Sequence, residues 1–178
     1  MCRRRLFLPA ALLAAVLAAA IALGLWYTRP RSWDALVGNA EAAALTALYS
    51  EATLTVTTGG GSTADISTYR TDGALAPDTP GGAALLSVLE DGRYRAALPN
   101  LAGPRDQLGQ DTGGSVQLSL MLDDGTALSL TFGDAGQLTV GREDGLCAYT
   151  ADCGQYEALA ALIRVHGQPV SEDGAPAS

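Results

Sequence analysis

The chain has 178 residues, of which 11 are basic and 19 acidic, and every basic residue is an arginine. Three arginines precede an apolar segment near the N-terminus. The rest of the chain therefore carries eight arginines and all nineteen acids, a formal charge of −11. Such a surface repels phosphate backbones, so nucleic acid is not an expected partner. The part beyond the apolar segment, roughly 140 residues, is long enough to bury a core without disulfides.

The N-terminal segment has the composition of a membrane span. The apolar run from Leu6 to Tyr27 has 22 uncharged residues. As a helix it would be about 33 Å long, enough for a hydrocarbon core of about 30 Å. Trp26 and Tyr27 end the run, as amphipathic rings do at a membrane interface. The sequence therefore predicts a transmembrane signal-anchor over 6–28, preceded by a basic cytoplasmic segment, 1–5.

A cleaved signal peptide is the alternative to this anchor. Ala18 and Ala20 offer the small residues that a cleavage site requires, and the product would then begin near Ile21. The apolar run continues past that point, which favours the uncleaved anchor. Three arginines precede the run, against Arg29 and Arg31 after it. The positive-inside rule thus predicts a single-pass protein of the cell membrane, with its C-terminal domain outside the cytoplasm.

Residues 29–166 are predicted to form one domain, beginning with a helix. Ser32 is a suitable N-cap, and the helix is expected to run from Trp33 to about Ala44. Apolar residues recur at helical spacing, which is typical of core packing: Trp33, Leu36, Val37 and Ala40.

A hairpin and a second helix are expected next. Period-two alternation with threonines predicts a strand from Leu45 to about Thr57, a glycine turn at 59–62 and a returning strand over 64–69. Thr79-Pro80 is expected to begin a helix over 81–90, because proline suits the first turn. Its inward-facing residues would be Leu85, Leu86 and Leu89.

The second half alternates most regularly. After a strand over 93–98 and a long loop over 99–114, four strands are predicted as an antiparallel meander: Val116–Leu122, Ala127–Phe132, Gln137–Val140 and Leu146–Tyr149. A closing helix over 154–165 should pack through Tyr156, Leu159, Leu162 and Ile163.

His166-Gly167 predicts the end of this helix, and 167–178 is expected to be a disordered acidic tail. The expected fold class is α+β: an N-terminal transmembrane helix followed by a small domain in which a twisted antiparallel meander packs against two or three helices.

Few residues carry candidate chemistry. Cys147 and Cys153 are six positions apart and form a possible disulfide in an oxidising compartment, although two free thiols are the alternative. His166 is the only histidine. It has no nucleophile motif to act on, so we expect no catalytic role for it. No cofactor motif and no metal-ligand spacing is present, so neither a cofactor nor a metal is expected.

Adjacent acids recur immediately before glycines, which is typical of tight turns and not of catalytic pairs. The four pairs are Glu90-Asp91, Asp123-Asp124, Glu143-Asp144 and Glu172-Asp173. If the protein were a hydrolase, the carboxylates expected to act would be Asp106 and Asp111, because long loops are often functional.

Several segments resemble uncharacterised bacterial domains that are anchored outside the cytoplasm by an N-terminal helix or lipid. They are Ser32-Trp-Asp-Ala-Leu-Val, Leu85-Leu-Ser-Val-Leu, Asp91-Gly-Arg-Tyr and Val116–Phe132 around Asp124-Gly125. The similarity covers about residues 32–164. It implies an anchored extracytoplasmic domain and no particular catalytic residue.

Together these features predict a non-catalytic binding or interaction module, anchored in the membrane through 6–28, with an envelope protein as a possible partner. Two alternatives stay open. One is an envelope hydrolase that uses carboxylates, and the other is a structural spacer domain.

Overall fold

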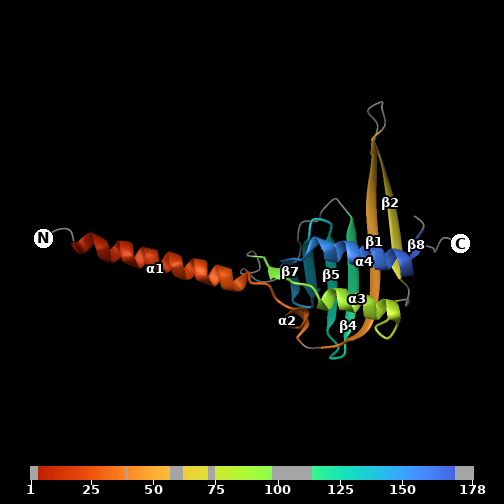
Figure 1. The fold of residues 1–178 in the computed structure, drawn as a ribbon, viewed down its shortest axis with the longest axis horizontal. Coiled ribbons are helices and arrows are strands. Elements are labelled where there is room, and N and C mark those ends of the chain that lie inside the picture. Colours follow the sequence, from red (N-terminus) through yellow and green to blue (C-terminus); the bar gives the residue numbers. More distant parts are fainter. Residues whose placement is uncertain (1–3, 39, 57–61, 72–74, 98–113, 171–178) are drawn as a thin grey trace.

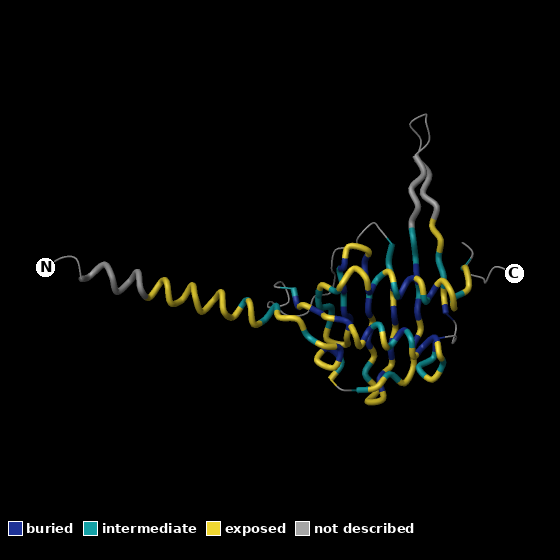
Figure 2. The backbone as a smooth tube through the Cα atoms, viewed as in Figure 1, coloured by how far each residue is buried: buried dark blue, intermediate teal, exposed yellow. Residues whose placement is uncertain are grey.

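A long N-terminal helix, α1 (Arg4–Tyr27), projects from a domain built on one sheet in the computed structural model (Figure 1). Eight large apolar side chains between Leu12 and Trp26 are 56–72% exposed, and Figure 2 shows the described part of the helix exposed along most of its length. Among the residues that the structure describes, no helix has the length and apolar composition needed to cross a membrane.

The structure describes residues 4–38, 40–56, 62–71, 75–97 and 114–170. For residues 4–11, 52–56 and 62–65, only the backbone is described.

Eight antiparallel strands form the sheet, in the order β3-β7-β6-β5-β4-β1-β2-β8. Their bounds are β1 Ala42–Val56, β2 Ser62–Thr71, β3 Arg95–Ala96, β4 Ser115–Leu122, β5 Ala127–Gly133, β6 Gln137–Arg142, β7 Gly145–Thr150 and β8 Gln168–Val170. Together with the helices, this sheet gives the expected α+β arrangement.

The meander β4–β7 confirms the prediction from alternating residues. In β4 and β5 every second side chain is buried, and cross-strand partners such as Leu118 and Leu130 lie on the same face of the sheet. Asp124 and Gly125 form the turn between these two strands, as predicted. Gly125 has φ 85°, and the Asp124 carboxylate accepts a hydrogen bond of 2.8 Å from the Thr126 N–H. That bond lowers the pKa of Asp124.

β1 is the longest strand and pairs on both sides. It pairs with β4 from Ala42 to Ser50 and with β2 from Ala47 to Val56. Beyond Ser50 its only described neighbour is β2, so the β1–β2 hairpin extends past the rest of the sheet (Figure 1). The predicted returning strand is confirmed, and the predicted glycine turn falls mostly on 57–61, outside the described residues.

Helices α3 (Pro80–Glu90) and α4 (Cys153–His166) lie side by side on one face of the sheet (Figure 1). Thr79 caps α3 as predicted, because its hydroxyl oxygen accepts from the Gly82 N–H at 3.1 Å. An N-cap on α4 was missed: the Asp152 carboxylate accepts from the Gly154 N–H at 3.1 Å.

These two helices bury leucine and isoleucine side chains against the sheet. Four of them are fully buried: Leu85, Leu89, Leu159 and Ile163. Three side chains that we also expected to face inward are only half-buried at the border of this core: Leu86, Tyr156 and Leu162.

The helix predicted to run to about Ala44 was too long, because α2 spans only Trp33–Val37. Gly38 ends it in the left-handed conformation, with φ 83° and its N–H bonded to the Asp34 carbonyl. Ala42 and Ala44 then pair with β4, so sheet pairing outweighs the helix propensity of alanine. Ser32 has N-cap backbone geometry but makes no side-chain cap bond.

The strand predicted over 93–98 is reduced to the two residues of β3, next to a single bridge between Arg31 and Tyr94. The tail prediction was wrong for Gln168–Val170, which form β8 by pairing with β2. Gly167 turns the chain with extended φ of −85° and not in the left-handed form. Glycine is required because a Cβ would lie 2.5 Å from the Ile163 carbonyl oxygen. Residues 171–178 lie outside the described part.

Candidate functional site

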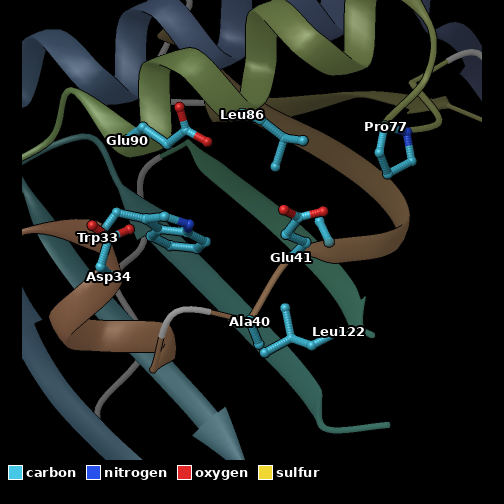
Figure 3. A pocket seen from close by; sticks show the side chains of 9 residues that line it. Trp33, Asp34, Ala40, Glu41, Pro77, Leu86, Glu90 and Leu122 are labelled. Atoms are coloured by element: carbon cyan, nitrogen blue, oxygen red, sulfur yellow. The ribbon is translucent and has the colours of Figure 1, made fainter. Parts of the chain in front are cut away.

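A cavity of about 530 Å³ opens between α2, α3 and the start of β1 (Figure 3). Its volume lies within the range of pockets that hold small ligands. Five separate segments of the chain meet there, so the site exists only in the folded domain. Its lining divides into an apolar floor and an acidic rim.

The floor centres on Trp33, the first residue of α2. Trp33 is 6% exposed, and its ring centroid lies 6.1 Å from that of Tyr94. The residues before Trp33 hold it in place, because Arg31 exchanges two backbone hydrogen bonds with Tyr94, at 2.8 and 3.0 Å. The other apolar side chains of the lining are Ala40, Ala42, Pro77, Leu86 and Leu122.

The rim carries three carboxylates, those of Asp34, Glu41 and Glu90. All three residues are exposed. None of their carboxylates forms a hydrogen bond or ion pair with any other described residue. Asp123 holds the backbone of Glu41 through two hydrogen bonds. The Asp123 carboxylate accepts from the Glu41 N–H at 3.2 Å, and the Asp123 backbone N–H donates to the Glu41 carbonyl at 2.9 Å. Figure 3 shows Glu41 and Glu90 on opposite sides of the opening.

The indole N–H of Trp33 adds a polar atom to the floor. In Figure 3 the nitrogen edge of the ring faces the space between Leu86 and Glu41. Within the described residues it has no hydrogen-bond partner. The residue as a whole is 94% buried, but its nitrogen is not among the fully buried unpartnered atoms and is open to the cavity. The cavity therefore presents one free donor and three free acceptors.

The described residues contain no group of three or more histidine, cysteine or acidic side chains that could hold a metal ion. The three carboxylates thus surround the cavity without converging on one point. The described residues of the lining include no serine, cysteine or histidine. The arrangement offers carboxylates and one N–H donor to a ligand.

A second polar cluster lies where α4 crosses β1. Arg164 donates to the Tyr49 hydroxyl and to the Glu51 carboxylate, both at 2.6 Å, and Tyr49 donates to Glu51 at 2.8 Å. The Arg164 guanidinium also lies 4.8 Å from the centre of the Tyr49 ring. These contacts join α4 to β1, and none of the three residues lines the Trp33 cavity, so we assign them a structural role.

The same contacts perturb the acidity of the cluster. Burial, together with the bond to Glu51, raises the pKa of Tyr49 well above its ordinary value. The Tyr49 hydroxyl first, and then Arg164, lower the pKa of Glu51. Glu51 in turn raises the pKa of Arg164. All three groups therefore keep their ordinary charge near neutral pH.

The residues singled out from the sequence lie elsewhere. Cys147 on β7 is half-buried and Cys153 at the start of α4 is exposed, and both are free thiols in the structure. Their disulfide stays a prediction. His166 is the last residue of α4, as expected, with its ring against α3, where a Cβ on Gly81 would lie 3.3 Å from it.

Of the acid pairs, Asp123-Asp124 and Glu143-Asp144 lie at hairpin turns as predicted. Glu90-Asp91 instead ends α3, and Glu90 belongs to the cavity. Asp106, Asp111 and Glu172-Asp173 lie outside the described residues.

The cavity residues were not recognised from the sequence. Trp33 was expected to be core, which is correct for its ring but omits its free N–H. Asp34 and Glu41 carry no motif, and Glu90 was assigned to a turn. No spacing could have found them, because their proximity depends on how α2, α3 and the start of β1 surround the cavity in the folded domain.

Comparisons with known proteins add no family assignment. No protein-family model, curated protein or solved structure matches the chain.

Proposed function

We propose that this protein is a membrane-tethered, non-catalytic binding module that works outside the cytoplasm and holds its ligand in the Trp33 cavity. The observation that carries the proposal is the cavity itself, where an apolar floor is combined with polar groups that have no described partner. A purely structural spacer has no need of a cavity in which a donor and three carboxylates face open space.

The tether is supported by the sequence and by exposure. The run from Leu6 to Tyr27 has no charged residue. The described part of α1 exposes large apolar side chains around the whole helix. A helix that is apolar on all sides is stable only when something covers it. A bilayer would cover it, with Trp26 and Tyr27 at the interface and Arg29 and Arg31 stacked on their rings, at 5.3 and 5.5 Å.

Binding without catalysis is supported by the lining. Catalytic carboxylates need a partner group that sets their protonation or directs a nucleophile. The rim acids Asp34, Glu41 and Glu90 are each without a described partner.

Protease treatment of intact cells that express the full chain tests the location. A full-length species in the membrane fraction that external protease degrades is the expected result. A soluble product that begins near Ile21 would contradict the tether, and a membrane-bound species that external protease cannot reach would contradict the orientation.

A cavity-filling variant tests the binding role. Leu86 lines the cavity and is only half-buried. Leu86→Trp should therefore occupy the space without opening the core. Molecules that co-purify with the wild-type chain should be lost in this variant and kept in Asp144→Asn, a matched change at an exposed turn away from the cavity. If all co-purifying molecules are recovered equally from both variants, the cavity is not the binding site.

A further inference from the structure

We infer that the Trp33 cavity receives the guanidinium group of an arginine residue in a partner polypeptide, with a carbonyl oxygen of that partner accepting the Trp33 N–H. The inference rests on the proposed function and specifies its ligand class. It follows from four properties of the cavity, which are its charge, the spread of its acids, its floor and its one donor.

Charge selects a cation. Asp34, Glu41 and Glu90 place three carboxylates around the opening, and the described lining residues include no basic side chain. None of the three is neutralised by a described arginine. The remainder of the chain beyond the apolar run is also acidic, which attracts cationic ligands over longer distances.

The spread of the acids selects an organic cation over a metal ion. A metal requires several ligands within bonding distance of one point, and no such group is present among the described residues. A guanidinium instead offers five N–H donors in one plane, which can reach carboxylates on different sides of a cavity. An ammonium concentrates its donors on one atom and suits this arrangement less well.

The floor and the donor select a residue within a polypeptide. Pro77, Leu86 and Leu122 provide an apolar surface for the methylene stem of an arginine. The Trp33 N–H faces the cavity and has no described partner, so a ligand that carries an acceptor gains a hydrogen bond there. A guanidinium has no acceptor, whereas the peptide carbonyl beside an arginine stem does.

The experiment uses the full chain in neutral detergent with Trp26→Phe, which leaves Trp33 as the only tryptophan. Emission of Trp33 is followed while three probes are added: N-acetyl-arginine N-methylamide, its uncharged citrulline counterpart, and agmatine, which has the guanidinium without a carbonyl. The arginine amide should bind saturably and at least ten-fold more tightly than the citrulline amide. Agmatine should bind about five-fold more weakly than the arginine amide.

Variants assign the contacts. Glu41→Gln and Glu90→Gln should each weaken the arginine amide several-fold, while Asp144→Asn, an exposed acid outside the cavity, should leave its affinity unchanged. Trp33→Phe, followed by calorimetry, should abolish the preference for the arginine amide over agmatine. Circular dichroism of each variant verifies that the domain is folded.

Three results would overturn the inference: equal binding of the citrulline amide, equal binding of the matching lysine amide, or no binding of the arginine amide to a folded chain. Each leaves the proposed function testable on its own, because co-purifying molecules that are lost in Leu86→Trp would still show a ligand of another chemistry.

Discussion

Removing the Tyr94 hydroxyl should destabilise the domain by about 1–3 kcal/mol. Tyr94 is fully buried, and its hydroxyl donates to the Leu89 carbonyl at 2.6 Å and accepts from Gln155 Nε2 at 3.0 Å. It therefore joins α3, the segment before β3 and α4. In Tyr94→Phe the ring stays in place, so the packing against Trp33 is retained and only the two hydrogen bonds are lost.

The magnitude follows from what each partner keeps. The Leu89 carbonyl still accepts from the Gly92 N–H at 3.2 Å, and Gln155 Nε2 still donates to the Val88 carbonyl at 2.9 Å. Neither group is left without a partner. The expected cost is thus that of two net hydrogen bonds, each contributing about 0.5–1.5 kcal/mol, and not the larger cost of an orphaned polar group.

Urea titration of the full chain in neutral detergent, followed by tryptophan fluorescence, measures this change as a lower midpoint at constant slope. Tyr69→Phe is the matched control, because the Tyr69 side chain is half-buried and its hydroxyl has no described hydrogen-bond partner. It should cost less than about 0.5 kcal/mol. A double-mutant cycle with Gln155→Leu should give a coupling of at least about 0.5 kcal/mol. A Tyr94→Phe variant as stable as Tyr69→Phe would refute the reasoning.

Three further predictions concern pH and backbone fit. Burial raises the pKa of Tyr94 to about 12. The folded state therefore holds this proton more tightly than the unfolded state does, and the free energy of unfolding should fall by about 2–3 kcal/mol between about pH 10 and pH 12. The fall should be less steep in Tyr94→Phe. Urea titrations at several pH values measure both. Arg164→Met should raise the lowered pKa of Glu51 toward its ordinary value, seen by NMR titration, and should change the free energy of unfolding by less than about 1 kcal/mol because both side chains are nearly half exposed. Gly82→Ala should destabilise the domain by about 3 kcal/mol, because the new Cβ would lie 1.9 Å from a backbone oxygen. Gly154→Ala should be neutral or stabilising, because the nearest atom to its new Cβ is 3.7 Å away. Thermal melts of both variants measure the difference in stability.

Local patterns in the sequence predicted the meander β4–β7, α3 and α4, because each depends on neighbours within a few residues. Alternation and Asp124-Gly125 define β4 and β5, and Thr79-Pro80 defines the start of α3. The end of α2 was missed because Ala42 and Ala44 have helical propensity but pair with β4, more than 70 residues away in the sequence. β8 was missed for the same reason, since its few residues form a strand only beside β2.

The cavity was beyond prediction for a related reason. The spacing of Trp33 identifies it only as a core residue. Whether its N–H has a hydrogen-bond acceptor can be seen only in the folded structure. Glu41 and Glu90 belong to different elements that meet in the folded domain. The sequence shows that acidic residues outnumber arginines. Which acids remain without an ion-pair partner depends on how α2, α3 and the start of β1 meet in the folded domain.

The place of β1 in the sheet has a consequence for the order of folding. β1 lies between β2 and β4 in the sheet. The edge of β1 over residues 42–50 therefore stays unpaired until residues 115–122 have formed β4. Pairing over so large a sequence separation is slow, whereas the hairpins of β4–β7 close loops of a few residues. If the domain is translocated in chain order behind the anchor, the β1–β2 hairpin emerges with an unpaired edge, which is a template for association with other chains. Pulsed hydrogen exchange should therefore protect β4–β7 before β1, and a chaperone that shields strand edges should raise the yield of folded protein.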